Sequence, residues 1–326
     1  MQFRTRRSVV ASGVLACMFG GFSSPVSAEA WPSRTVTIIT PFAAGSVTDA
    51  TARIIAQALQ EEFGRPFVVE NKAGAGGLIA AQAVARAIPD GYTLLLTTNS
   101  THSAAPALFK KVPFDPIQDF TPIARIGGFP SVVVVNPTLK VNSIQELVAY
   151  AKANPGKLSY GHGNSTGHIA GEAIKYQAGL DIVRVSYRSN PVAITDLIAG
   201  HILVMIPDLN NALPQIAEKN MRPLAVLTKT RSSSLPDVPT LDESVIPGFD
   251  LCAWAGLFGP ANLPPEVVEK IAGVIGAALA KPDIQEKFKN SGIEPYWGDT
   301  AEFKKFVASE LVKWTSVIKS AGIEPE

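Results

Sequence analysis

Residues 35–64 read TVTIITPFAAGSVTDATARIIAQALQEEFG, which is a strand, a loop and a helix in succession. The β-branched run over 35–40 predicts a buried strand. The apolar residues at helical spacing after Asp49 predict a helix that Gly64 ends. Similar strand and helix patterns alternate along the rest of the chain. This alternation predicts an α/β fold with largely parallel sheets.

The predicted strands form two groups, and each group looks like a sheet flanked by helices. The strands are 35–40, 67–70, 93–98, 131–135, 158–161, 183–186, 202–206, 224–227 and 253–259, and the chain from Pro264 onward is predicted to be helical. We therefore expect two lobes: 29–129 plus 252–326 forms lobe one, and 130–251 forms lobe two. Two crossings between lobes make a hinge, and a cleft between hinged lobes commonly holds a ligand.

The first 28 residues have the three parts of an export signal. Arg4, Arg6 and Arg7 are followed by an uncharged apolar stretch over 8–20, and Val26-Ser27-Ala28 supplies small residues for cleavage. The apolar stretch is too short for a membrane span, which needs about 20 residues. We therefore predict a signal peptide over 1–28 and a periplasmic protein. The paired arginines leave the general and the twin-arginine export routes both open.

Composition argues against several classes of protein. The net charge of +1 over 326 residues gives no sign of nucleic-acid binding, which would show a strongly basic patch. Cys252 is the one cysteine beyond the export signal, so no intramolecular disulfide is expected. The four histidines lack the spacing of a metal site, and the glycines over 74–77 lack the third glycine of a dinucleotide loop. We expect a monomer without metal or cofactor.

Two loops between a strand and a helix offer donors for an anion. The loops 41–48 and 161–168 each precede a helix start, where unpaired backbone N–H groups and the helix dipole favour negative charge. Asp208 is ambiguous, since it either accepts a hydrogen bond from a ligand or caps the next helix. The expected ligand-binding residues, which include others near strand ends, are Phe42, Ser46, Val47, Thr48, Asn99, His102, Asn164, Ser165, Thr166, Arg188 and Asp208.

The second loop also contains a G-x-S-x-G pattern over 163–167. Between a strand and a helix, that pattern is typical of the nucleophile elbow of α/β-hydrolases. A secreted serine hydrolase with Ser165 as nucleophile is therefore the competing interpretation. It requires an acid and then a histidine later in the chain, but the last 125 residues contain no histidine. This gap favours a protein that binds and does not catalyse.

The chain after the signal resembles the Bug-type receptors of tripartite tricarboxylate transport systems over nearly its whole length. The order and spacing of several short motifs carry this resemblance: Pro41-Phe42 with Gly45 and Asp49, Val68-Val69-Glu70-Asn71, Gly74-Ala75-Gly76-Gly77, Asp90-Gly91-Tyr92, Ala153-Asn154-Pro155-Gly156, Leu235-Pro236-Asp237-Val238-Pro239-Thr240 and Gly256-Leu257-Phe258. The resemblance implies a two-lobe Venus-flytrap periplasmic binding protein fold. It also implies a di- or tricarboxylate or aromatic acid as ligand, and large and small membrane permease subunits as partners.

Three positions depart from the family pattern. The first loop has Gly45-Ser46 where relatives usually have two glycines, and the later stretches 186–189 and 206–209 read SYRS and IPDL. All three lie near the ends of predicted strands. The particular carboxylate therefore cannot be carried over from relatives.

Overall fold

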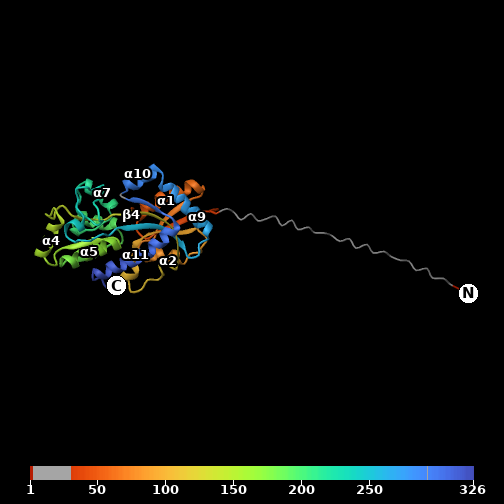
Figure 1. Cartoon of the computed structure of the whole chain (residues 1–326), viewed down its shortest axis with the longest axis horizontal. Helices are drawn as coiled ribbons and strands as arrows, with labels where there is room; N and C mark the ends of the chain where they lie inside the picture. Colours follow the sequence, from red (N-terminus) through yellow and green to blue (C-terminus); the bar gives the residue numbers. More distant parts are fainter. Residues whose placement is uncertain (3–30, 292) are drawn as a thin grey trace. The chain divides into compact units, whose positions relative to one another are not determined.

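A computed structural model describes residues 1–2, 31–291 and 293–326, and Figure 1 traces the chain. The predicted signal peptide lies largely outside the described residues. Six strands form the first sheet, in the order β11-β4-β10-β3-β1-β2. Their bounds are β1 Val36–Thr40, β2 Phe67–Asn71, β3 Thr93–Thr98, β4 Phe120–Phe129, β10 Ala253–Pro260 and β11 Glu294–Gly298.

Five strands form the second sheet, in the order β7-β6-β8-β5-β9. Their bounds are β5 Val132–Val135, β6 Ser159–His162, β7 Val183–Ser186, β8 Val204–Met205 and β9 Arg222–Val226. The chain leaves the first sheet after β4 and returns to it at β10. Two segments thus connect the sheets, while the lobe boundaries themselves stay a prediction.

Both sheets are mixed, so the expectation of largely parallel sheets was wrong in part. β1 pairs in parallel with β2 and β3, and β6 pairs in parallel with β7 and β8. β10 runs antiparallel to β3 and β4, and β5 runs antiparallel to β8 and β9. The antiparallel strands β5 and β10 are those that directly follow the two connections between the sheets.

Helices cover both sheets (Figure 1). Among the described residues, the helices and helical turns are α1 Val47–Phe63, η1 Ala75–Gly77, α2 Leu78–Ala85, η2 Ser100–Ala104, α3 Ala105–Leu108, α4 Ile144–Ala153, α5 Ser165–Ala178, α6 Asn190–Ala199, α7 Leu209–Ala217, α8 Leu241–Ser244, α9 Pro265–Leu279, α10 Pro282–Asn290 and α11 Thr300–Ser320. Gly64 ends α1 in the left-handed conformation at φ 64°, as its place in the sequence predicts. Within the described residues, no helix is long and apolar enough to cross a membrane.

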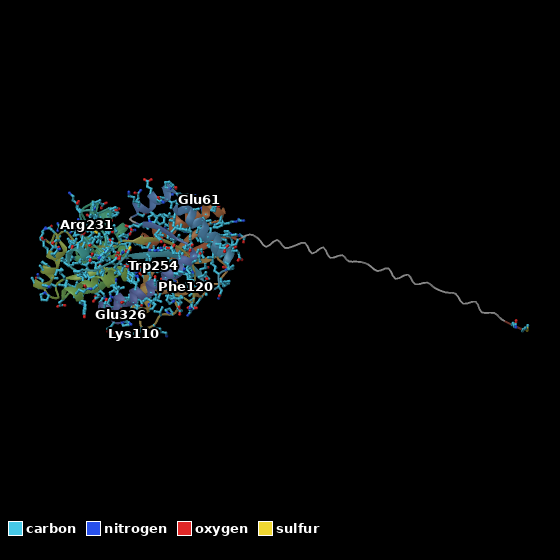
Figure 2. The ribbon with its side chains drawn as sticks, in the orientation of Figure 1. Glu61, Lys110, Phe120, Arg231, Trp254 and Glu326 are labelled. Carbon is cyan, nitrogen blue, oxygen red and sulfur yellow. The ribbon has the colours of Figure 1, made fainter. Side chains whose placement is uncertain are left out.

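Helix α11 takes part in the cores of both sheets. Phe303 packs with Trp254 and Phe258 against the first sheet, where Figure 2 labels Trp254. Trp314, farther along the same helix, lies in the cluster under the second sheet, and its indole Nε1 donates to Glu310 at 2.7 Å. One C-terminal helix therefore connects the two apolar cores within the compact unit Pro32–Glu326.

The strands β4 and β11 were not predicted, and the chain after Pro264 is not helical throughout. β11 pairs antiparallel with β4, but the register shifts between Pro295 and Gly298. Most of β11 is exposed, so it lacks the apolar alternation that indicates a strand. β4 contains Pro122 and two glycines, which interrupt its pattern in the same way.

Candidate binding site

The loop between β1 and α1 is held in shape by Asp49. Its carboxylate accepts hydrogen bonds from the Gly45 backbone N–H at 3.0 Å and from Asn71 Nδ2 at 3.0 Å, and it pairs with Arg53 at 2.9 Å. Burial raises the pKa of this carboxyl, but these hydrogen bonds and the guanidinium charge outweigh burial and leave the pKa below its usual value. Ser46 caps α1 by accepting from the Asp49 N–H at 3.3 Å.

The loop between β6 and α5 is held by a buried carboxylate, Asp208. Asn164 Nδ2 donates to both Asp208 oxygens at 3.0 Å, and Asn190 Nδ2 donates to one of them at 2.9 Å. The other ends of the two amides fix the loop: Asn164 Oδ1 accepts from Gly167 N–H at 2.9 Å, and Asn190 Oδ1 accepts from Gly163 N–H at 3.1 Å. Asp208 stands at the start of α7, but its side chain makes no capping bond there.

Asp208 is surrounded by neutral donors. Ser131 Oγ adds a bond at 3.2 Å to those from the two asparagines, and no cationic side chain lines the same cavity among the described residues. Burial raises the pKa of the Asp208 carboxyl to about 6, although the hydrogen bonds act in the opposite direction. Asp208 therefore orients the second loop at the expense of an unfavourable buried charge.

The start of α5 contacts the end of β3, and the first loop contacts the start of α7. Asn99 Nδ2 donates to Thr166 Oγ1 at 3.1 Å, and Ser165 Oγ donates to Ser100 Oγ at 2.8 Å. Asn211 Nδ2, near the start of α7, donates to the Gly45 carbonyl at 3.0 Å. These bonds join residues around the first sheet to residues around the second. They bring the starts of α1 and α5 to one place.

A small cavity of about 10 Å³ lies where these loops meet. Two residues that line it each have a buried polar atom without a hydrogen-bond partner among the described residues: Thr48 Oγ1 and Asn99 Oδ1. Unpaired buried polar atoms are uncommon in folded proteins, so these two oxygens are available to hydrogen-bond a bound molecule. The predicted residues that line this cavity are Phe42, Ser46, Val47, Thr48, Asn99, Asn164, Thr166 and Asp208.

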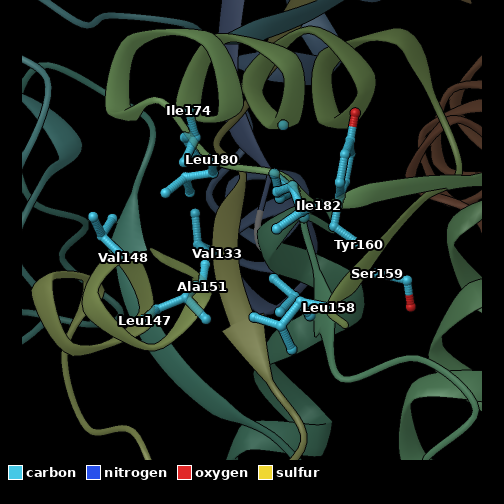
Figure 3. Close-up of a pocket in the computed structure, with 13 residues that line it drawn as sticks. Val133, Leu147, Val148, Ala151, Leu158, Ser159, Tyr160, Ile174, Leu180 and Ile182 are labelled. Carbon is cyan, nitrogen blue, oxygen red and sulfur yellow. The ribbon is translucent and has the colours of Figure 1, made fainter. Parts of the chain in front are cut away.

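A larger cavity of about 270 Å³ adjoins the small one, since the two share Phe42, Ser100, Gly163 and Asn164. Of the other predicted residues, Ser165 and Arg188 line the larger cavity. A third void, of about 20 Å³, lies among apolar side chains in the core of the second sheet (Figure 3). It could hold about one water molecule by volume but offers almost no polar partner for one, so it is a packing gap.

His102 was expected to bind ligand, but the structure places it outside both cavities. Its ring is fully buried and lies against Phe258 at 4.1 Å and Phe120 at 4.5 Å between centroids, and it lines neither cavity. The π-helical turn η2 after β3 rotates this side chain into the aromatic core of the first sheet. Burial lowers the pKa of the His102 imidazole to about 3, so the ring is neutral.

Two further histidines stand beside the second loop without reaching Ser165. His162 Nδ1 meets the Asn164 carbonyl at 3.1 Å and Nε2 meets Ser186 Oγ at 3.0 Å, while His168 contacts Arg184. Burial lowers the pKa of both imidazoles to about 3. In the hydrogen bonds of the described residues, Ser165 pairs with Ser100 and Asn99, not with a histidine.

Sequence analysis missed several residues that shape the site. Asn190 and Ser100 contact the second loop and the start of α5, and Ser131 contacts Asp208. Arg184 and Glu326 line the larger cavity. The sequence Asn190-Pro191 is typical of a helix start and could have indicated Asn190 as a residue near a strand end. The described residues contain no group of three or more His, Cys, Asp or Glu side chains that could hold a metal ion.

Residues 51–323 match the family described as the tripartite tricarboxylate transporter family receptor. The chain belongs to this family. Three solved structures are similar to this receptor-family chain. R. palustris Rpa4515 with adipate is 34% identical, with a TM-score of 0.88, and the match covers 91% of this chain and 100% of that one. The periplasmic binding protein BugD is 33% identical, with a TM-score of 0.86 and coverage of 91% and 100%.

The third structure is MatC (Rpa3494) from Rhodopseudomonas palustris with bound malate. It is 30% identical, with a TM-score of 0.83, and the match covers 88% of this chain and 99% of that one. These likenesses and the two helix-flanked sheets show that this Bug-type family member has the two-lobe α/β fold of periplasmic binding proteins.

Proposed function

We propose that this protein is a periplasmic receptor that captures a small carboxylate between the starts of α1 and α5 and passes it to large and small membrane permease subunits. One observation carries the proposal: two helix starts, one beside each sheet, meet at a cavity lined by Thr48 and Asn99, whose side chains each keep an unpaired oxygen among the described residues. Helix starts present N–H groups without intrahelical acceptors, and these suit an anion. The relatives solved with adipate and malate support this ligand class.

The proposed site binds an anion without a cationic side chain in the small cavity. Thr48 Oγ1 donates to the ligand carboxylate, together with backbone N–H groups of α1 and the hydroxyls of Ser165 and Thr166. Because the small cavity measures about 10 Å³, the loops must separate for a ligand to enter. A hinge at the two connections between the sheets provides this motion.

Binding, and not ester hydrolysis, is the role we assign to Ser165. A serine nucleophile needs a neighbouring base, and the nearest imidazoles are engaged with Asn164, Ser186 and Arg184. The export-like N-terminal segment and the family support the periplasm as the location.

Calorimetric titration of ligand-stripped protein with malate, succinate, adipate and benzoate tests this proposal. Thr48→Val should weaken binding of the best acid by about 10- to 100-fold, because it removes a hydrogen bond to a charged group. Thr195→Val is the matched control: Thr195 is exposed on α6 and lines neither cavity, so affinity should be unchanged. If none of these acids binds, or if both variants bind like the unaltered protein, the proposed site is wrong.

A further inference from the structure

A ligand bound in the small cavity can extend into the larger cavity, because the two cavities adjoin. The two cavities share the lining residues Phe42, Ser100, Gly163 and Asn164. Leu108 and Phe109 also line the larger cavity and supply an apolar wall beside Phe42. A ligand anchored by one carboxylate between the helix starts therefore meets apolar surface next.

Two arginines also line the larger cavity. Arg188 follows β7, is exposed, and makes no ion pair with any described residue. Arg184 lies within β7, with 28% of its side chain exposed, and contacts His168. Because burial keeps the pKa of His168 near 3, its neutral ring adds no charge of its own beside Arg184. The larger cavity thus has cationic donors, which the small cavity lacks.

Glu326 already holds one of these arginines. Its backbone N–H donates to the Leu108 carbonyl and its carbonyl accepts from the Lys110 N–H, both at 2.9 Å, which places it beside Lys110 as Figure 2 shows. From this fixed backbone its carboxylate reaches across the cavity and pairs with Arg184. The Glu326 side chain is 56% exposed, so this is a carboxylate that solvent and ligand can both reach.

On the basis of the function proposed above, we infer that Arg184 and Arg188 form a second anion subsite, which takes the far carboxylate of an elongated diacid, and that Glu326 competes with that carboxylate for Arg184. The near carboxylate lies between the helix starts. The apolar middle of the diacid contacts Phe42 and Phe109. The ligand class is thereby narrowed from any small carboxylate to a diacid with an apolar chain or ring between its charges.

Pairs of acids that differ by one carboxylate test this inference. We choose adipate against hexanoate, and terephthalate against benzoate, and measure the dissociation constant of each by calorimetry. The dissociation constant of the monoacid divided by that of the matching diacid measures how much the second subsite contributes to binding. Arg188→Gln should lower this ratio about tenfold, because it removes a charged partner of the far carboxylate. Glu326→Gln should raise the ratio about two- to fivefold, since an exposed ion pair no longer competes.

Glu324→Gln is the matched control, because Glu324 is also exposed but lines neither cavity. It removes the same charge two residues away and should leave the ratio unchanged. A ratio that stays constant in both Arg188→Gln and Glu326→Gln overturns the inference, as does an equal rise in Glu324→Gln. Monoacids that bind while diacids do not would remove the second subsite and keep the proposed function. If neither kind of acid binds, the proposed function itself fails.

Discussion

Acidification should destabilise this protein through the buried neutral imidazole of His102. In the folded state its pKa is lowered from 6.5 to about 3 because the ring is fully buried among phenylalanines. Below pH 6.5 the imidazole of His102 binds a proton in the unfolded chain but not in the folded chain. The free energy of unfolding is therefore highest above pH 6.5 and decreases as the pH falls toward 3. Two pH units below 6.5, near pH 4.5, this group alone costs about 3 kcal/mol of unfolding free energy.

His102→Phe removes this proton while keeping a ring in the aromatic cluster. We would measure the free energy of unfolding in urea by circular dichroism at about pH 7 and about pH 4.5, for the variant and the unaltered protein. The loss on acidification should be about 3 kcal/mol smaller in the variant. His162 and His168 have similarly lowered pKa values, but they remain in both proteins and cancel in the difference.

His201→Gln provides the control, because this histidine is exposed and lines neither cavity. It should show the same loss on acidification as the unaltered protein. Equal losses in the unaltered protein and His102→Phe would refute the reasoning. At about pH 7 the affinity for carboxylates should also stay the same in His102→Phe, whereas a ligand-binding histidine would change it.

Two further predictions concern packing and pH. Gly171→Ala should lower the free energy of unfolding in urea by about 1–3 kcal/mol, since the new Cβ would lie 2.1 Å from the buried ring of Tyr160. Gly273→Ala has open space around its Cβ and should instead stabilise α9 slightly. The reverse order of stabilities would contradict the packing argument. Carboxylate affinity, measured by calorimetry, should fall as the pH rises from about 5 to about 7, because the Asp208 carboxyl lines the small cavity and ionises near pH 6. The fall should be about tenfold for each unit by which bound ligand raises the pKa of Asp208. Asp208→Asn should remove that dependence, and an unchanged pH profile in this variant would assign it to another group.

The parallel parts of both sheets could be predicted from the sequence because their signals are local. The run 35–40 and the helix ending at Gly64 are short-range patterns of β-branching, helical spacing and a terminal glycine. β4 and β11 form through pairing between residues that lie far apart in the chain. β11 buries little apolar surface, so its own residues do not indicate a strand. Long-range pairing, not local preference, decides these two elements.

The grouping of candidate residues around the small cavity was predictable where it depends on strand ends. Residues that follow β1, β3 and β6 come together around the small cavity, as their positions suggest. His102 follows β3 in the same way, yet the π-helical turn over Ser100–Ala104 turns it into the core. The polar sequence of this turn does not reveal which side chain faces inward. Asn99 lines the small cavity, whereas His102, three residues later, packs in the aromatic core.

Asp208 shows why an anion site can include an acidic residue. Its carboxylate repels a bound anion, but its hydrogen bonds to Asn164 and Asn190 hold the amides that in turn fix the N–H groups of Gly163 and Gly167. The raised pKa lets a proton bind when a ligand carboxylate arrives, which reduces the repulsion. The small cavity therefore selects for a carboxylate through geometry and neutral donors. The arginines of the larger cavity would select a ligand by its length and its second charge. They can be replaced without removing the hydrogen bonds that hold the second loop.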